Sequence, residues 1–524
     1  MMLKLVCAWV TSYSTLLIAN WILPHSRGRQ VLISGPRALR SVLASIVFIG
    51  LAAFTWAQPS RAHQSQLELR SSDVRLVQAF NWAKKEALSY VFDGDPVGSW
   101  YEAALPGRRS FCMRDVSHQA AGAQALGLAT YTHNMLRKFA ENISGSRDWC
   151  SYWEINYLNQ PAPVDYINDK KFWYNLPANF DVIDASYRMY LWTRDRSYIE
   201  DPVFLNFYDR TVTDYVSRWD LSPDRIMHRT IQVDGPPYFR GDPSYNESQA
   251  DVMLGVDLLA VQYAGYRSYA AIQKLRGNDE AADLFQKRAS EIKFLVNTTW
   301  WNASGAYFYS FVDKDHQLKG KADADLLYWG IVDDGAKAES TITALLTRMQ
   351  SESADEVEPE SHYAEVLYKY GVPDPAYAEI MDLTRPGRVR QEYPEVSFSI
   401  IGAICNGLMG VNVDPVESAD DPSAIVVTTL PQLTKQTHWA ELRNLPVGTG
   451  TISIRHEGSK QTAFWNQGKD KLIWRAMFPG TSAKLIVNGR AVRAESGMLH
   501  SHKPITWIQI PVGAGLHARV HVRE

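Results

Sequence analysis

Cysteine is scarce in this sequence, and the motifs that most often build metal sites are absent. Four of the 524 residues are cysteine: Cys7, Cys112, Cys150 and Cys405. No CxxC or HExxH occurs, so we expect no dedicated zinc site, and nothing in the sequence indicates a cofactor. In an oxidising compartment Cys112 and Cys150 could form a disulfide, although their spacing does not decide this. Cys405, in its apolar segment, would then be a buried thiol.

An excess of basic residues is also missing. The formal net charge is −3, but the first 62 residues hold six basic residues and no acidic one. The remaining chain therefore has 48 basic and 57 acidic residues, a net charge of −9. Phosphate binding needs a basic surface, so an acidic body argues against a nucleic-acid partner. It also disfavours a polyanionic substrate, although a local basic pocket could bind one.

Long apolar runs are confined to the first 62 residues. One covers residues 5–23, and a second covers residues 41–56 behind two arginines and before small residues at 57–62. The second run has the order of a secretory signal, and one explanation for its distance from the chain start is that translation begins near Val31. The rival interpretation is a retained membrane anchor. We expect a secreted or periplasmic protein that meets a membrane only through an uncleaved leader.

The body has the composition of a folded protein, with 46% hydrophobic and 12% aromatic residues. Apolar residues recur at helical spacing from about Val74 to Val413. Some of these segments are apolar on all sides and others are amphipathic, which predicts buried helices inside an outer layer, an α/α toroid. The clearest expected helices are residues 74–91, 117–139, 180–193, 250–274, 280–297 and 397–409.

The pattern changes after Asp420. Alternating or β-branched segments at 424–428, 451–455, 472–475 and 505–510, with turn residues such as Asn488-Gly489, predict a small antiparallel β-sandwich. We therefore expect a leader (1–62), a catalytic toroid (63–413), a linker (414–423) and a β-domain (424–524).

The first candidate for chemistry is the loop 106–115, which enters a helix through Arg114-Asp115. Asp accepts and Arg donates several hydrogen bonds, so the pair can hold neighbouring sugar hydroxyls. The structural alternative is that Asp115 caps a helix starting near Val116. His118, one turn later, could add a polar contact or be a core histidine.

Two further loops carry acids in front of apolar helices. In the segment 241–251, Glu247 could be a general acid, and Asp251 follows where it could line the same pocket. In the segment 390–398, Glu392 or Glu395 could supply a second carboxylate. Helix-terminal charge and loop solvation are the plainer explanations. In a toroid, however, all three loops lie at one end, and glycosidic hydrolysis needs two carboxyls across a pocket.

On these residues the sequence resembles the six-hairpin (α/α)6-toroid glycosidases, the superfamily of glucoamylases, trehalases and α-L-rhamnosidases. The stretch Phe111–Asp115 is similar to the Arg-Asp segment with which glucoamylases hold a terminal sugar, and to the Arg-Asp of the rhamnosidase motif. The resemblance implies that Arg114 and Asp115 bind substrate and that Glu247 is the general acid. The stretch Tyr363–Glu392 resembles the rhamnosidase segment that ends at the base, which implies Glu392 in that role, with Glu395 as the alternative.

The chain also departs from these patterns. The rhamnosidase motif has Glu directly after Arg-Asp, where this chain has Val116, and the tandem Trp-Glu-Glu of glucoamylases is absent. Glu154 therefore competes for the acid role, and the neighbouring Trp153 offers the flat aromatic face that sugar sites use.

The sequence thus predicts an exported, exo-acting, inverting glycoside hydrolase acting on an oligosaccharide or polysaccharide. The alternatives are a polysaccharide lyase on the same toroid, a phosphorolytic relative that would need a phosphate pocket, and a carbohydrate-binding protein without activity.

Overall fold

The computed structural model describes residues 63–228, 240–247, 251–351, 357–415 and 424–523. The chain divides into two compact units, Met1–Pro59 and Ser60–Glu524, and the described residues all belong to the second. The expected leader and most of the expected linker lie outside the described residues. Within the described ranges, no helix combines the length and apolarity needed to cross a membrane.

Six helices of the described residues contact one another in a closed order. Helix α3 packs on α5, α5 on α9, α9 on α11, α11 on α14, and α14 on α16, which returns to α3. Several of these helices are buried on most sides, as in α9, because small residues lie among the large ones. The bounds are α3 (Met113–Ala125), α5 (Ala178–Thr193), α9 (Val256–Leu275), α11 (Ala324–Trp329), α14 (Tyr363–Lys369) and α16 (Pro394–Gly402).

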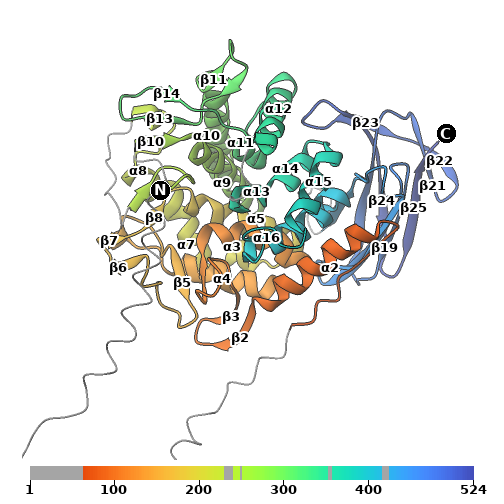
Figure 1. The fold of residues 1–524 in the computed structure, drawn as a ribbon, viewed down its shortest axis with the longest axis horizontal. Helices are drawn as coiled ribbons and strands as arrows, with labels where there is room; N and C mark the ends of the chain where they lie inside the picture. Colours follow the sequence, from red (N-terminus) through yellow and green to blue (C-terminus); the bar gives the residue numbers. More distant parts are fainter. Residues whose placement is uncertain (1–62, 229–239, 248–250, 352–356, 416–423, 524) are drawn as a thin grey trace, which may run out of the picture. The chain divides into compact units, whose positions relative to one another are not determined.

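A second set of helices packs outside this order (Figure 1). Helix α2 contacts α16, α4 contacts α3 and α5, α10 contacts α9, α12 contacts α11, and α15 contacts α14. Helix α4 shows the amphipathic pattern, since Tyr131, Met135, Leu136 and Phe139 are buried between polar residues. The bounds are α2 (Val74–Ser89), α4 (Ala129–Glu141), α7 (Pro202–Arg210), α10 (Asp279–Thr298), α12 (Ala336–Ser351) and α15 (Pro373–Leu383).

Three predicted helices differ from those observed. The helix expected over 117–139 is divided into α3 and α4, because Gly127 takes a left-handed conformation (φ +83°) that ends a helix. The helix expected from residue 250 begins at Val256, because residues 252–255 pair with strand β13 instead. The last expected helix ends at Gly402 and continues as the π-helical turn η4 (Ala403–Leu408), which holds Cys405.

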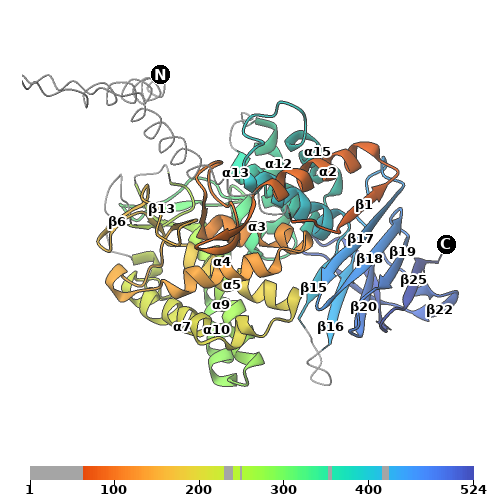
Figure 2. The ribbon, with the colours of Figure 1, turned by 90° about the horizontal axis from the view of Figure 1, so that it is seen from below.

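The C-terminal region consists of two sheets, on the side of the molecule away from the short strands β6, β8, β10 and β13 (Figures 1 and 2). Phe464 of β19 and Trp474 of β20, from different sheets, stack at 5.1 Å between ring centroids. The larger sheet has the order β1 (Glu68–Ser71), β17 (Trp439–Val447), β18 (Gly450–Glu457), β19 (Gln461–Asn466), β25 (His517–Val522), β21 (Lys484–Val487) and β22 (Arg490–Arg493). The smaller has the order β15 (Asn412–Asp414), β16 (Ile425–Thr429), β20 (Leu472–Pro479), β24 (Pro504–Val512) and β23 (Glu495–Met498).

The purely antiparallel arrangement expected for these strands is wrong at one pairing. Strands β16 and β20 pair in parallel, because the chain passes through β17, β18 and β19 of the other sheet before it returns. Strand β1 pairs with β17 although about 370 residues separate their paired positions, such as Glu68 and Arg443. The expected Asn488-Gly489 turn joins β21 to β22, with both residues at positive φ.

Short strands pair in the loops that lead into the inner helices, and they fix where those loops lie. Strand β4 pairs with β5, and β8 pairs with β9. Strand β13 lies between β10 and β14 and pairs with both. Their bounds are β4 (Ser110–Cys112), β5 (Glu154–Asn156), β8 (Tyr174–Asn175), β9 (Arg240–Asp242), β10 (Val252–Gly255), β13 (Phe311–Asp313) and β14 (Leu318–Lys319). The remaining elements are β2 (Val91–Asp95), β3 (Gly98–Tyr101), η1 (Gly145–Arg147), β6 (Tyr166–Asn168), β7 (Lys171–Phe172), α6 (Ser197–Glu200), η2 (Thr211–Tyr215), α8 (Val216–Arg218), η3 (Ile226–His228), β11 (Trp301–Asn302), β12 (Tyr307–Phe308) and α13 (Val357–Glu360).

Candidate active site

Arg114 and Asp115 lie in the first turn of α3, where strand β4 runs directly into the helix. Cys112 occupies the N-cap position and makes no side-chain capping bond, so Asp115 is not the helix cap. Arg114 Nε lies 3.6 Å from Asp115 Oδ1. Freed from capping, the Asp115 carboxyl is available to the pocket in front of the helix.

Strand pairing brings a second carboxyl beside this helix entrance. Cys112 of β4 pairs with Glu154 of β5, so Trp153 and Glu154 stand next to the start of α3. Arg108 Nη1 lies 2.6 Å from Glu154 Oε2, and Ser110 donates to Oε1 of the same carboxyl. The Arg114 guanidinium lies 5.6 Å from the centre of the Trp153 ring, a cation–π distance.

The loop after β9 carries Tyr245 and Glu247 to the other side of Arg114. Arg114 Nη1 lies 3.4 Å from Glu247 Oε1 and 3.4 Å from the Tyr245 carbonyl oxygen. Buried Asp257, at the start of α9, anchors the loop by accepting from Ser244 Oγ (2.6 Å) and from the Tyr245 amide (2.7 Å). The Glu247 side chain remains 43% exposed, facing solvent at the mouth.

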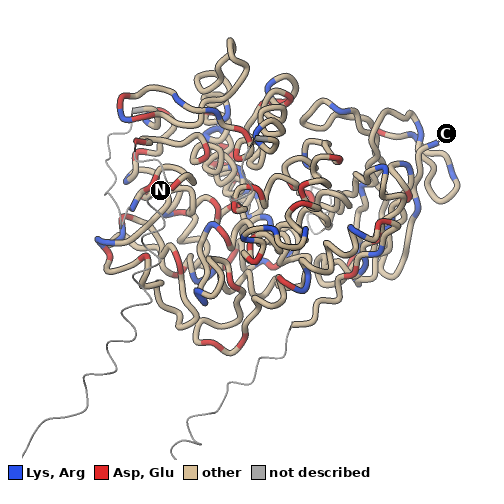
Figure 3. The backbone as a smooth tube through the Cα atoms, viewed as in Figure 1, with Lys and Arg blue, Asp and Glu red and all other residues tan. Residues whose placement is uncertain are grey.

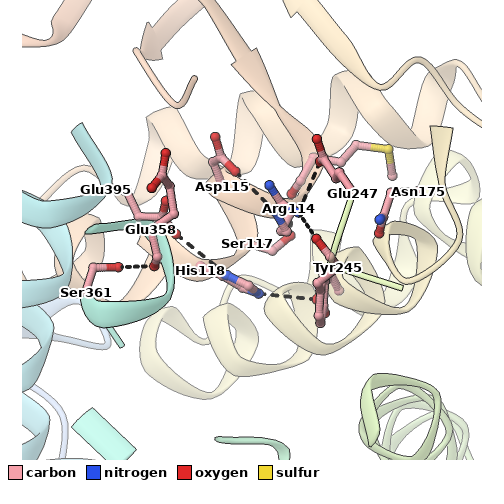
Figure 4. A network of polar contacts seen from close by, with 12 residues as sticks. Arg114, Asp115, Ser117, His118, Asn175, Tyr245, Glu247, Glu358, Ser361 and Glu395 are labelled. Carbon is pink, nitrogen blue, oxygen red and sulfur yellow. Dashed lines mark hydrogen bonds and ion pairs between the residues drawn. The ribbon is translucent and has the colours of Figure 1, made fainter. Parts of the chain in front are cut away.

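Glu395 completes the group from α16, in whose first turn it is buried. Its Oε1 lies 2.8 Å from Nε2 of His362, the residue before α14, and 4.0 Å from Nδ1 of His118 on α3. Glu358 of α13 lies nearby and forms an ion pair with Arg390 at 3.0 Å. Figure 4 shows Glu395 and Glu358 on one side of Arg114 and Asp115, with Glu247 and Tyr245 on the other.

Arg114, Asp115, Glu247 and Glu395 line a pocket of about 340 Å³, a volume within the range of small-molecule sites. Six carboxyl groups and two guanidinium groups face it, together with two tryptophans. The lining residues are Ala104, Leu105, Arg108, Cys112, Arg114, Asp115, Trp153, Glu154, Asp165, Trp173, Glu247, Glu358, Tyr393 and Glu395.

Crowding of carboxyls in a buried space favours their protonated forms. Burial, followed by the charge of Glu395, raises the pKa of Asp115 well above its ordinary value. Burial and a hydrogen bond with Glu154 raise the pKa of Asp165 to about 8. Burial raises the pKa of Glu358 as well. Three carboxyls of the pocket are therefore shifted toward their protonated forms, the form that a general acid needs.

His118 lies behind this pocket, with only 9% of its side chain exposed. Its ring lies among Tyr245, Tyr328, Trp329 and His362, so it is neither exposed in the pocket nor an apolar core histidine. Its Nε2 lies 3.5 Å from Oδ1 of buried Asp181 on α5. His118, His362 and Glu395 present ligand-type atoms within 4.8 Å of one another, a cluster that motif spacing did not predict.

Besides His118, two of the expected site residues lie outside the pocket. Glu392 is exposed and does not line the pocket, and its carbonyl oxygen accepts a hydrogen bond from Tyr90. Asp251 is 83% exposed and pairs with Lys314 at 3.2 Å, because β10 rather than a helix follows it. The disulfide that the sequence left open between Cys112 and Cys150 is not formed: both residues are buried free thiols.

Sequence reasoning missed Asp165, Glu358 and His362. Asp165 lies in an irregular loop and Glu358 in a helix of one turn, so neither precedes a long apolar helix. His362 ends a polar segment that matches no motif. Its place in the site depends on the contact with Glu395, which is 33 residues later in the sequence.

A larger hollow of about 900 Å³ lies at the other end of α5, between the helices and the C-terminal sheets. It is lined by Asp184, Arg188 and Lys369, among others, and by none of the residues expected to form the site.

Comparisons with known proteins bear on the fold. No protein-family model and no curated protein matches the sequence. The structure is similar to an α-L-rhamnosidase from Dictyoglumus thermophilum (TM-score 0.55, 15% identity, 88% of this chain and 51% of that one). It is also similar to a GH78 family rhamnosidase of Bacillus sp. GL1 (TM-score 0.52, 14% identity, 77% and 40%) and to a candidate kojibiose phosphorylase from the human microbiome (0.50, 9%, 91% and 68%).

The chain thus spans about half the length of these rhamnosidases or less. At such low identities the similarity concerns architecture, and it confirms the resemblance drawn from the Arg-Asp motif at that level. The described residues share their fold with these rhamnosidases.

Proposed function

We propose that this protein is a glycoside hydrolase that removes a sugar from the end of an oligosaccharide or polysaccharide. The observation that carries the proposal is the pocket in which Arg114, two tryptophans and six carboxyl groups converge. Paired carboxyls, aromatic faces and hydrogen-bonding groups are what glycosidic cleavage needs. A pocket of this size, rather than a groove, suits a terminal sugar.

The architecture supports this reading. We infer that the six helices in closed order are the inner ring of an (α/α)6 toroid and that the two C-terminal sheets form a β-sandwich. Loops before the inner helices then meet at one end of the ring. This explains why residues as distant as Arg114, Glu247 and Glu395 face one pocket.

We assign water activation to Glu395. It is buried, it lines the pocket, and His362 holds one of its oxygens. Glu392, the base implied by the rhamnosidase-like segment, is exposed outside the pocket. Arg114 and Asp115 would hold the sugar hydroxyls from the floor between the two walls.

The general acid comes from the opposite wall, formed by Glu154, Asp165 and Glu247. Asp165 is the candidate that the electrostatics favour, since its pKa of about 8 keeps it protonated at neutral pH. Glu247, the acid expected from the sequence, is committed to an ion pair with Arg114. Because acid and base belong to opposite walls with room for water between them, we propose inversion.

The proposal includes export through the leader and a carbohydrate as the partner. Lys and Arg are interspersed with Asp and Glu along the described chain (Figure 3), and the pocket has an excess of carboxyls over guanidinium groups. This distribution suits a neutral sugar better than a nucleic acid or a uronate.

The test is proton NMR of the purified chain mixed with a panel of oligosaccharides and polysaccharides. A new reducing-end anomeric signal is expected, with the first-formed anomer opposite to that of the substrate. Retention of configuration would overturn the inverting assignment. An unsaturated, ultraviolet-absorbing product would instead establish a lyase, and line broadening without turnover would establish a binding protein.

A further inference from the structure

Glu395 at the pocket wall and two histidines behind it have the identities and spacing of a metal site. His362 Nε2 and His118 Nδ1 lie 2.8 Å and 4.0 Å from the same oxygen of Glu395, and the three ligand-type atoms fall within 4.8 Å. Ligand atoms bound tetrahedrally at zinc distances are roughly 3.3 Å apart. The observed separations bracket that value, so small side-chain movements would suffice.

The geometry points to a binding site for one divalent transition-metal ion, held by His118, His362 and Glu395. Two imidazoles and one carboxylate suit Zn²⁺ and its spectroscopic substitute Co²⁺ better than Ca²⁺ or Mg²⁺, which prefer oxygen ligands. Three protein ligands leave a position for water, as in catalytic zinc sites. Zn²⁺ is the ion that we expect.

The surroundings of the two imidazoles support this assignment. Within the described residues, His118 Nε2 and His362 Nδ1 are buried and make no hydrogen bond. The opposite nitrogens, His362 Nε2 and His118 Nδ1, are the ones that face Glu395, so no hydrogen bond to a described residue from the far side of either ring competes with this orientation. His118 Nε2 lies 3.5 Å from Asp181 Oδ1, the arrangement by which a carboxylate orients a metal-bound imidazole.

Asp181 is itself fixed for such a role. Its Oδ1 accepts a hydrogen bond from the Tyr245 hydroxyl at 2.6 Å, which ties it to the loop that carries Glu247. The ion would thus be connected to both walls of the pocket.

Charge also favours a cation here. Six carboxyl groups and two guanidinium groups line the pocket, and the carboxyl of Asp115 experiences the charge of Glu395 directly. Arg108 and Arg114 are engaged with Glu154 and Glu247, respectively. A dication beside Glu395 would offset repulsion among the carboxyls that outnumber these two guanidinium groups.

This inference deepens the proposed function, on which it rests for the role of the ion. With an ion bound, Glu395 would be one of its ligands, and the ion would supply the activation of water that the proposed function assigns to Glu395 alone. Metal binding itself can be measured without any substrate, so the two proposals fail separately.

The experiment uses the full chain, stripped with chelator and titrated with ZnCl₂ by calorimetry and with CoCl₂ by visible absorption. We expect one ion per chain and a Co²⁺ spectrum typical of four or five ligands. His362→Gln and Glu395→Gln should weaken binding by more than about 100-fold, since even outer-shell changes cost 10–100-fold. Glu247→Gln is the matched control, because it removes a pocket carboxyl that is not a ligand.

Absence of binding to the wild-type chain, or equal binding by the His362→Gln and control variants, would overturn the site. Circular dichroism of each variant separates loss of ligand from loss of fold, and a misfolded His362→Gln is replaced by His118→Gln. Hydrolysis that persists in chelator would leave the glycosidase proposal standing without the metal. Tight Zn²⁺ binding without hydrolysis of any glycan would confirm the metal site and overturn the glycosidase proposal.

Discussion

Nε2 of His362 lies 2.8 Å from Oε1 of Glu395, and this contact joins the start of α14 to the first turn of α16. It fixes one carboxylate oxygen of Glu395 and leaves the residue at the pocket wall. A carboxylate oriented in this way is suited to activating water, whereas the exposed Glu392 three residues earlier is not.

The first prediction separates these two glutamates. Glu395→Gln should lower kcat by about 10²–10⁴-fold, because the group that activates water loses its charge. Glu392→Gln should keep activity within about twofold, since its side chain is outside the pocket. Initial rates on the substrate identified by NMR are the measurement. The reverse result, with Glu392 essential and Glu395 dispensable, would restore the base implied by the rhamnosidase-like segment.

The second prediction concerns Asp165 and pH. A general acid works only while protonated, so kcat/KM should fall as pH rises through about 8, the pKa of Asp165. In Asp165→Asn this alkaline limb should disappear and the rate on natural glycosides should drop by about 10²–10⁴-fold.

Leaving-group chemistry provides the control for Asp165. A dinitrophenyl glycoside needs no protonation to depart, so Asp165→Asn should hydrolyse it at nearly the wild-type rate. If Glu247→Gln rather than Asp165→Asn shows this selective rescue, the acid is Glu247, as the sequence implied.

The third prediction concerns His456, which joins the helical region to the larger sheet. Its Nε2 lies 3.0 Å from the Met409 carbonyl oxygen and its Nδ1 lies 2.8 Å from Thr462 Oγ1. Burial lowers the pKa of His456 from 6.5 to about 4. The folded state thus prefers neutral His456, so this stabilisation is complete above pH 6.5 and is lost as pH falls toward 4.

Between pH 7.5 and pH 5 the loss from His456 should be about 2 kcal/mol in the free energy of unfolding. Urea titrations of the wild type and of His456→Gln at both pH values measure it. The variant should be less stable at pH 7.5 but lack this part of the pH dependence. The exposed His438→Gln serves as the control, and an unchanged pH dependence in His456→Gln would contradict the assignment.

The fourth prediction tests the close contact of two inner helices. A Cβ atom on Gly122 of α3 would overlap the carbonyl oxygen of Phe398 in α16, whereas a Cβ atom on Gly402 of α16 would lie no closer than 3.6 Å to any neighbour. Gly122→Ala should therefore lower the free energy of unfolding by about 3 kcal/mol, because the overlapping atom belongs to the backbone of α16 and cannot rotate away. Gly402→Ala should be neutral or stabilise by up to about 1 kcal/mol through helix propensity.

Thermal and urea unfolding measure both alanine variants. Equal stabilities for Gly122→Ala and Gly402→Ala would show that α3 and α16 do not approach as closely as the structure has them.

The sequence by itself determined the helical body, the strand-rich C-terminus and the importance of the segment around Arg114 and Asp115. These follow from the periodicity of apolar residues and from the loop that enters a helix, and both signals depend only on residues close together in the sequence. The same local reasoning failed at residue 250, where pairing with β13, about 60 residues later, converts the start of a helix into strand β10.

Only the tertiary structure decided between Glu392 and Glu395, added Asp165 and His362, and removed Asp251 from the pocket. Each of these depends on contacts between segments far apart in the sequence, such as His118 with Glu395 or Cys112 with Glu154. The burial of a side chain and the charges around it are set by residues that only folding brings near, because desolvation and Coulomb interactions act through space rather than along the chain.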